Sequence, residues 1–159
     1  WQLAAELGHY VADSHEPLHL TLNYNGQLTG NYGIHSRYET QMINPHLSEL
    51  PLPDSTSNYW SSVIDSVFRY IEEIYPYVNE IIAADDLAAD QDPNYNSTYY
   101  TILWEELDSL TIIAIHCAIV DLASIWHTAW VNAGHPSLSS KDIDSFPNDY
   151  LIHQNYQTI

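Results

Sequence analysis

LTIIAIHCAIVDLASIW, residues 110–126, is the stretch that decides the fold class. On a helix these residues would be apolar on nearly every face, and a helix of that kind lies in the middle of a bundle. The helical pattern around it runs from about Thr98 to Asn132, and Gly134 with Pro136 provides a stop signal. We therefore expect one long, buried central helix that other elements surround.

Three shorter stretches upstream also carry helical patterns. They are residues 1–15, 34–43 and 59–84. Pro17 bends or ends the first stretch and Pro76 kinks or splits the third, because proline lacks a backbone N–H and clashes inside a helix. Turn-rich or proline-punctuated segments lie between them, and no stretch alternates as a strand would. The sequence predicts an all-α fold, a multi-helix bundle around the central helix.

The composition restricts the partners of the chain. Twenty-one acidic residues stand against three basic ones among 159 residues, for a net charge of −18 at neutral pH. Such a surface attracts cations and repels nucleic acid and anionic membranes at long range. No apolar run reaches the roughly 20 residues of a membrane span, so we expect no transmembrane segment. Cys117 is the single cysteine, which excludes an intrachain disulfide.

A second distinctive stretch is GHYVADSHEPLH, residues 8–19, in which three histidines and two acids are gathered. His9 and Asp13 are four residues apart, so their side chains share one face of a helix. His35 and Glu39 repeat this spacing. Imidazole and carboxylate groups are ordinary zinc ligands. A single pair of this kind is weak evidence for a metal, and two pairs together are stronger.

His19 lies beyond the first pair. On a straight helix it would be rotated by about 240° from Asp13, at 100° per residue. Pro17 supplies the break that swings it back toward the pair. The sequence thus predicts a metal site between helices. Its ligands are His9, Asp13, His19, His35 and Glu39.

Four other polar residues near these segments or in the central helix have structural interpretations. His15 points off the face shared by His9 and Asp13, so we expect it behind the ligands or on the surface. His116 and Asp121 lie among apolar residues of the central helix and need hydrogen-bond partners there. For Arg37 we expect an ion pair with an acid rather than an approach to phosphate.

HYVADSHEPLH (9–19) followed by GIHSRYE (33–39) resembles the superfamily that joins zinc-dependent phospholipase C with the single-strand-specific zinc nucleases. Its members share a His-x-x-x-Asp, a histidine six residues further on, and a second helix with His-x-x-x-Glu or His-x-x-x-Asp. The Asn/Gly loop between these motifs and IWHTAWVNAGHP (125–136) also resemble the family. The resemblance therefore spans residues 1–136, as the C-terminal portion of such a helical domain.

The resemblance implies roles for the predicted ligands. His19, His35 and Glu39 would hold one zinc and leave an open position, as catalytic zinc sites do. His9 and Asp13 would contribute to neighbouring metals, with the carboxylate bridging two of them. Zinc ions in such an arrangement clamp a phosphodiester and lower the pKa of a bound water.

In the family, the remaining ligands come from a segment upstream of these motifs. The resemblance therefore implies that this chain completes one metal centre by itself and requires the upstream segment as a partner for the others. It also implies poor phosphodiester hydrolysis by the chain alone. Residues 137–159 would form a C-terminal extension, in which FPNDYLIHQNYQTI (146–159) weakly resembles the start of a bacterial secretion-sorting module.

Three functions follow as expectations. The first is a secreted, zinc-dependent phosphodiesterase of the phospholipase C type, which Glu39 and the short loop between the two pairs favour. The second is a nuclease or nucleotidase of the sister family, which DSHEPLH (13–19) resembles slightly more because of His15, although the net charge disfavours a polyanion. The third is a non-catalytic, metal-stabilised structural subunit. The substrate, phospholipid or nucleotide, and the oligomeric state stay open.

Overall fold

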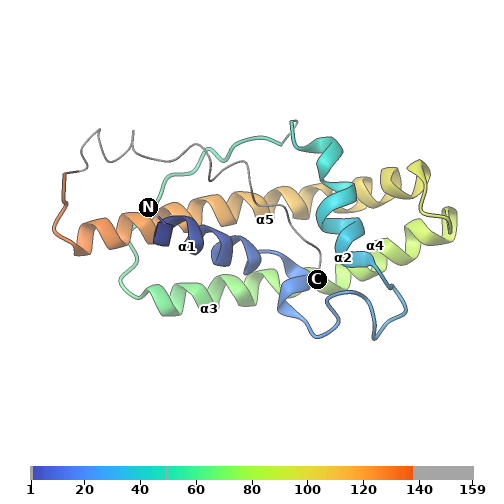
Figure 1. Ribbon diagram of the computed structural model, residues 1–159, viewed down its shortest axis with the longest axis horizontal. Coiled ribbons are helices and arrows are strands. Elements are labelled where there is room, and N and C mark those ends of the chain that lie inside the picture. Colours follow the sequence, from blue (N-terminus) through green and yellow to red (C-terminus); the bar gives the residue numbers. More distant parts are fainter. Residues whose placement is uncertain (1, 49, 138–159) are drawn as a thin grey trace.

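The computed structural model describes residues 2–48 and 50–137 (Figure 1). Helices are the only regular elements over these residues, so the predicted all-α fold is confirmed. The elements are α1 (Gln2–Asp13), η1 (Pro17–Leu20), α2 (Ile34–Ser36), η2 (Arg37–Met42), η3 (Asn44–His46), α3 (Val63–Ile74), α4 (Tyr77–Gln91) and α5 (Ser97–Asn132). The predicted extension lies outside the described residues except for Ser137.

The proline and cap signals explain most of the helix boundaries. Pro76 splits the third predicted stretch into α3 and α4, as expected. Helix α3 begins later than predicted, at Val63, because the Ser62 side chain accepts a hydrogen bond from the Asp65 N–H and caps the helix there. Helix α4 continues past the predicted end to Gln91, through a stretch that contains Leu87, Ala88 and Ala89, residues of high helix propensity.

Helix α5 extends along the whole molecule, and the other helices cover it in two groups (Figure 1). Helices α1 and α3 lie along one half, where Val11, Trp60, Tyr70 and Ile125 form a small core. Helix α4 and the continuous α2–η2 segment pack along the other half, in a larger core. The larger core includes the buried residues Leu18, Ile34, Tyr38, Met42, Ile81, Leu103 and Leu107.

Helix α5 is less completely covered than its sequence predicts. Ile113, Ile119, Trp126 and Trp130 are each at least 40% exposed in the described part of the chain. The helix is also long and apolar enough to cross a membrane, judged by length and composition only. This corrects our expectation that no segment is long and apolar enough for a membrane span. That expectation counted uninterrupted apolar runs, and Asp121 interrupts the run in α5.

The non-helical linker before α3 is attached to α5 through its backbone. The Trp60 N–H donates to Thr128 Oγ1 at 2.9 Å, and the Asn58 N–H donates to Ser124 Oγ at 3.0 Å. The ring of His116 donates from Nε2 to the Pro51 carbonyl at 2.5 Å. Hydroxyl and imidazole groups thus satisfy backbone groups that have no helical partner. The structural role predicted for His116 agrees with this contact.

Replacing Thr128 by valine tests this attachment. Thr128 is 1% exposed, and valine keeps its shape while leaving the buried Trp60 N–H without an acceptor. We expect the free energy of unfolding to fall by about 1–3 kcal/mol, the usual cost of one unsatisfied buried group. Urea denaturation measures it, with Thr101→Val, an exposed threonine on the same helix, as the control. Equal stability of Thr128→Val and the control would contradict the role assigned to the hydroxyl.

Candidate metal centre

The chain makes a turn where α1 ends, and this brings His19 close to the first pair. Helix α1 ends at Asp13, and Pro17 opens the short η1 helix after a turn. The Glu16 side chain caps η1, because its Oε2 accepts from the His19 N–H at 2.7 Å. As a result, His19 Nδ1 lies 3.4 Å from Asp13 Oδ1.

The second segment, α2–η2, begins at a glycine. Gly33 has φ 86°, a left-handed conformation that glycine adopts without strain, and Ile34 then starts the helix. His35 and Glu39 lie on one side of it, with His35 Nε2 2.7 Å from Glu39 Oε2. Glu39 is in η2, which has π-helical hydrogen bonds, a form that occurs frequently at functional sites.

The five predicted ligands form a continuous row. His9 Nε2 is 3.2 Å from Asp13 Oδ2, and Asp13 contacts His19. The Nε2 atoms of His19 and His35 are 3.0 Å apart, and His19 Nε2 is 3.9 Å from Glu39 Oε2. Ligand atoms about 2.1 Å from a tetrahedral zinc are about 3.4 Å from one another, so these separations bracket the value that zinc requires.

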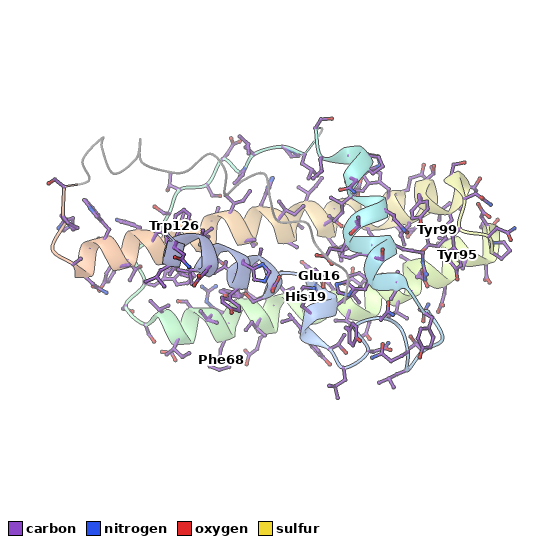
Figure 2. All side chains as sticks on the ribbon, in the orientation of Figure 1. Glu16, His19, Phe68, Tyr95, Tyr99 and Trp126 are labelled. Carbon is purple, nitrogen blue, oxygen red and sulfur yellow. The ribbon has the colours of Figure 1, made fainter. Side chains whose placement is uncertain are left out.

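Glu16 joins the group, although the sequence did not single it out. Ligand atoms of Glu16, His19 and His35 all lie within 4.8 Å of one another, so this group could hold a metal ion. Figure 2 shows Glu16 and His19 together near the middle of the molecule, beyond the end of α1. Glu16 Oε1 is buried and has no hydrogen-bond partner among the described residues. Such an atom calls for an unseen partner such as water or an ion.

Burial and hydrogen bonding shift the pKa values of Glu16, His35 and Glu39. Burial raises the pKa of Glu16 to about 7, in spite of the backbone hydrogen bonds that lower it. The hydrogen bond to Glu39 raises the pKa of His35, and the same bond lowers the pKa of Glu39. Without a metal, Glu16 therefore keeps its proton up to about pH 7, beside the paired His35 and Glu39. A metal ion would replace these protons, because its ligands must be deprotonated.

The row of ligands opens into a pocket of about 410 Å³ that is accessible to solvent. Asp13, His19 and His35 line it together with Tyr10 and Tyr24. Both tyrosines are more than half exposed, so they extend the wall of the pocket outward. The pocket therefore offers an entry path for a small ligand beside the candidate ligands.

His15 is a buried structural residue, so of the two positions predicted for it, behind the ligands or on the surface, the surface one is wrong. It is 3% exposed, with Nδ1 2.8 Å from the Val11 carbonyl and Nε2 3.1 Å from Asp121 Oδ2. Its ring stacks on Tyr70 at a centroid distance of 4.2 Å. His15 thus ties α1 to α5 and α3, and the structural role predicted for Asp121 agrees with this contact.

Comparison of the chain with protein-family models, with curated proteins and with solved structures gives no match. The geometry of the site would allow Glu16, His19 and His35 to hold a metal ion, and it leaves the identity of the metal open.

Changing Glu16 to glutamine tests the state of the metal-free site. The pKa of Glu16 is raised on folding, so its contribution to stability is present at low pH and is lost as pH rises through about 7. Glutamine keeps an oxygen to cap η1 and cannot ionise. We expect the variant to gain up to about 3 kcal/mol over the wild type at about pH 8.5 and little at about pH 5.

Urea unfolding with chelator present at both pH values makes this measurement. Glu6→Gln, an exposed glutamate on α1, is the matched control and should behave alike at both. A stability difference for Glu16→Gln that does not depend on pH would show that Glu16 is not held as the burial argument requires.

Proposed function

We propose that this protein is a secreted, zinc-dependent phosphodiesterase of the phospholipase C type. In this proposal His19, His35 and Glu39 hold a zinc ion, and His9 with Asp13 contributes to a neighbouring metal. The observation that carries the proposal is the convergence of two separate segments on one point, where His19 and His35 Nε2 atoms lie 3.0 Å apart at a solvent-accessible pocket. The resemblance of both segments to the zinc phospholipase C and nuclease superfamily gives the reaction type.

The donor set fits zinc. Two imidazole nitrogens and carboxylate oxygens are the usual non-sulfur ligands of this ion. The same donors also accept manganese, iron or cobalt, so a competition between metals is required to identify the one that binds. Zinc, when bound, would supply a nucleophilic water at neutral pH and neutralise charge on the phosphate.

The two arginines among the described residues are both paired with carboxylates, and this favours a metal-dependent reaction. Arg37 forms an ion pair with Asp85, with NH2 2.8 Å from Oδ1, and Arg69 pairs with Glu73 on α3. Among the described residues that line the pocket there is neither lysine nor arginine. A phosphodiester in this pocket would therefore find no fixed side-chain cation other than a protonated histidine. Metal ions are the remaining means to balance its charge.

The net charge of −18 favours a small or zwitterionic phosphate ester over a long polyanion. We therefore place phospholipid ahead of single-stranded nucleic acid as the substrate. The nuclease alternative remains to be tested by the same assay. His15, which carried part of the resemblance to the nucleases, is engaged with Asp121 rather than with the row of ligands.

A structural metal centre is the second candidate function, and Glu16 favours it. Four protein ligands close a tetrahedral zinc site, whereas catalytic sites keep one position open. Glu16 Oε2 lies 3.9 Å from His19 Nε2, at the same distance as Glu39 Oε2. If both carboxylates bind, the metal has no open position in a tetrahedral arrangement and stabilises the fold instead.

Hydrolysis assays distinguish these functions. With zinc added, we expect the chain alone to give slow but measurable turnover of a chromogenic phosphodiester and of phosphatidylcholine vesicles, and less cleavage of single-stranded DNA. His35→Ala should lower turnover by about 100-fold or more, because a misplaced catalytic element costs about that much. His135→Asn, a histidine outside the site, should leave it unchanged. Cleavage of DNA alone would favour the nuclease, and no hydrolysis together with tight zinc binding would favour the structural centre.

Removal of metal should destabilise the protein. A buried carboxylate that lacks a partner lowers the free energy of unfolding, and a bound metal compensates for this loss. We expect the melting temperature of the zinc-loaded protein to fall in chelator and to recover when zinc is restored. Differential scanning calorimetry measures both steps, with His135→Asn as a variant that should respond as the wild type does. A melting temperature that is indifferent to chelator would remove the basis for either metal-dependent function.

A further inference from the structure

Arg37 lies two residues after His35 in the sequence, yet its side chain points into the protein and is only 7% exposed. Its NH1 donates to the Tyr32 carbonyl at 2.6 Å, and its NH2 donates to the Asn31 carbonyl at 3.3 Å. Both carbonyls belong to the turn that leads into α2. The guanidinium therefore holds the turn that immediately precedes His35.

The same guanidinium is anchored to the core between α4 and α5. Its NH2 and Nε donate to Asp85 Oδ1 at 2.8 and 3.2 Å, and Asp85 is 1% exposed. Nε also donates to Tyr99 Oη at 2.9 Å, while the Tyr99 hydroxyl donates to Asp85. The Tyr95 ring lies 4.2 Å from the guanidinium carbon. Figure 2 shows Tyr95 and Tyr99 at the α4–α5 end of the molecule.

Asn31 reinforces this connection from the turn itself. Its Nδ2 donates to Asp85 Oδ2 at 2.8 Å and to Asp86 Oδ1 at 2.7 Å. The turn before α2 is therefore tied to α4 through its backbone carbonyls by Arg37 and through a side chain by Asn31. A planar guanidinium with donors in a fixed fork sets such a geometry more strictly than a flexible ammonium group does.

We propose that Arg37, through its contact with Asp85, is a positioning residue for His35 and sets the distance between His35 and His19. This inference rests on the proposed metal centre, in which that distance matters. The His35 and Glu39 side chains are 27% and 46% exposed, so close packing around them does little to fix their place. The position of their backbone must come from buried neighbours. Arg37 is a buried neighbour whose guanidinium contacts both the backbone of the turn and α4.

The buried residues Ile34 and Tyr38 offer the competing explanation. Both pack into the larger core and could hold the α2–η2 segment in place by apolar contact alone. In that case Arg37 would matter for stability and not for the spacing of the ligands. A buried ion pair is often no more stabilising than a well-packed apolar pair, so its value for geometry is separable from its value for stability.

The first arm of the experiment uses metal-free protein. The rings of His19 and His35 have centroids 4.9 Å apart, so their protons should give nuclear Overhauser contacts in NMR spectra. We expect these contacts to be lost in the double variant Arg37→Met, Asp85→Asn, which leaves no unpaired buried charge and keeps an oxygen for Tyr99. Arg37→Lys should keep them in part. Arg69→Met, the matched arginine of an exposed pair, should keep them fully.

The second arm measures zinc affinity by calorimetric titration under conditions where every variant is folded, as judged by circular dichroism. We expect the double variant to bind zinc about 10- to 100-fold more weakly than the wild type, the usual effect of losing a group that orients a ligand. The zinc affinity of Arg37→Lys should lie between those of the wild type and the double variant. The zinc affinity of Arg69→Met should equal that of the wild type.

The outcomes separate the two proposals. Unchanged ring contacts and unchanged affinity in the double variant would overturn the role of Arg37 while leaving the zinc centre intact. Ring contacts that depend on Arg37 in a protein that binds no zinc would support the positioning role and overturn the proposed function. A loss of stability without any change in contacts or affinity would assign Arg37 to the fold alone.

Discussion

The constraint on which the structure depends is the need to cover the apolar surface of α5. Its 36 residues make a helix about 54 Å long, whereas α1 and α4, with 12 and 15 residues, reach only about 18 and 22 Å. No single one of these helices can cover such a length, so partners must follow one another along it. Two cores result, and the chain has to change direction between them. The candidate metal centre lies where α1 ends and η1 joins the larger core.

That location explains why one carboxylate has two roles. Glu16 uses Oε2 to cap the short helix that redirects the chain, its Oε1 is left buried without a hydrogen-bond partner among the described residues, and its carboxylate lies beside His19 and His35. The cap is a requirement of folding, and the second oxygen is available because of it. A metal ion at this point would connect the geometry of the turn to the chemistry of the site. The cap on η1 and the binding of a metal would then depend on the same side chain.

The sequence predicts those parts of the site that depend on local geometry. The two His-acid pairs follow from helical spacing alone, and the return of His19 follows from Pro17. Four-residue spacing does not predict Glu16 as a ligand, because α1 has already ended at Asp13. The burial of His15 depends on Asp121, which is 106 positions away, and no local pattern predicts such a contact. The exposed side of α5 likewise depends on which helices pack against it, since the central part of α5 is apolar on nearly every face.

The attachment of the linker has a consequence for how this protein can vary. Because the hydroxyls of Ser124 and Thr128 bind backbone N–H groups, these two contacts do not depend on which side chains the linker carries, and the Trp60 side chain adds a contact with the small core. Most of its residues between Pro51 and Tyr59 are exposed. Substitution, insertion of a reporter peptide or cleavage of the chain near Ser55 would therefore leave the helices docked. The linker is the natural place to open the chain into two fragments that reassemble around α5.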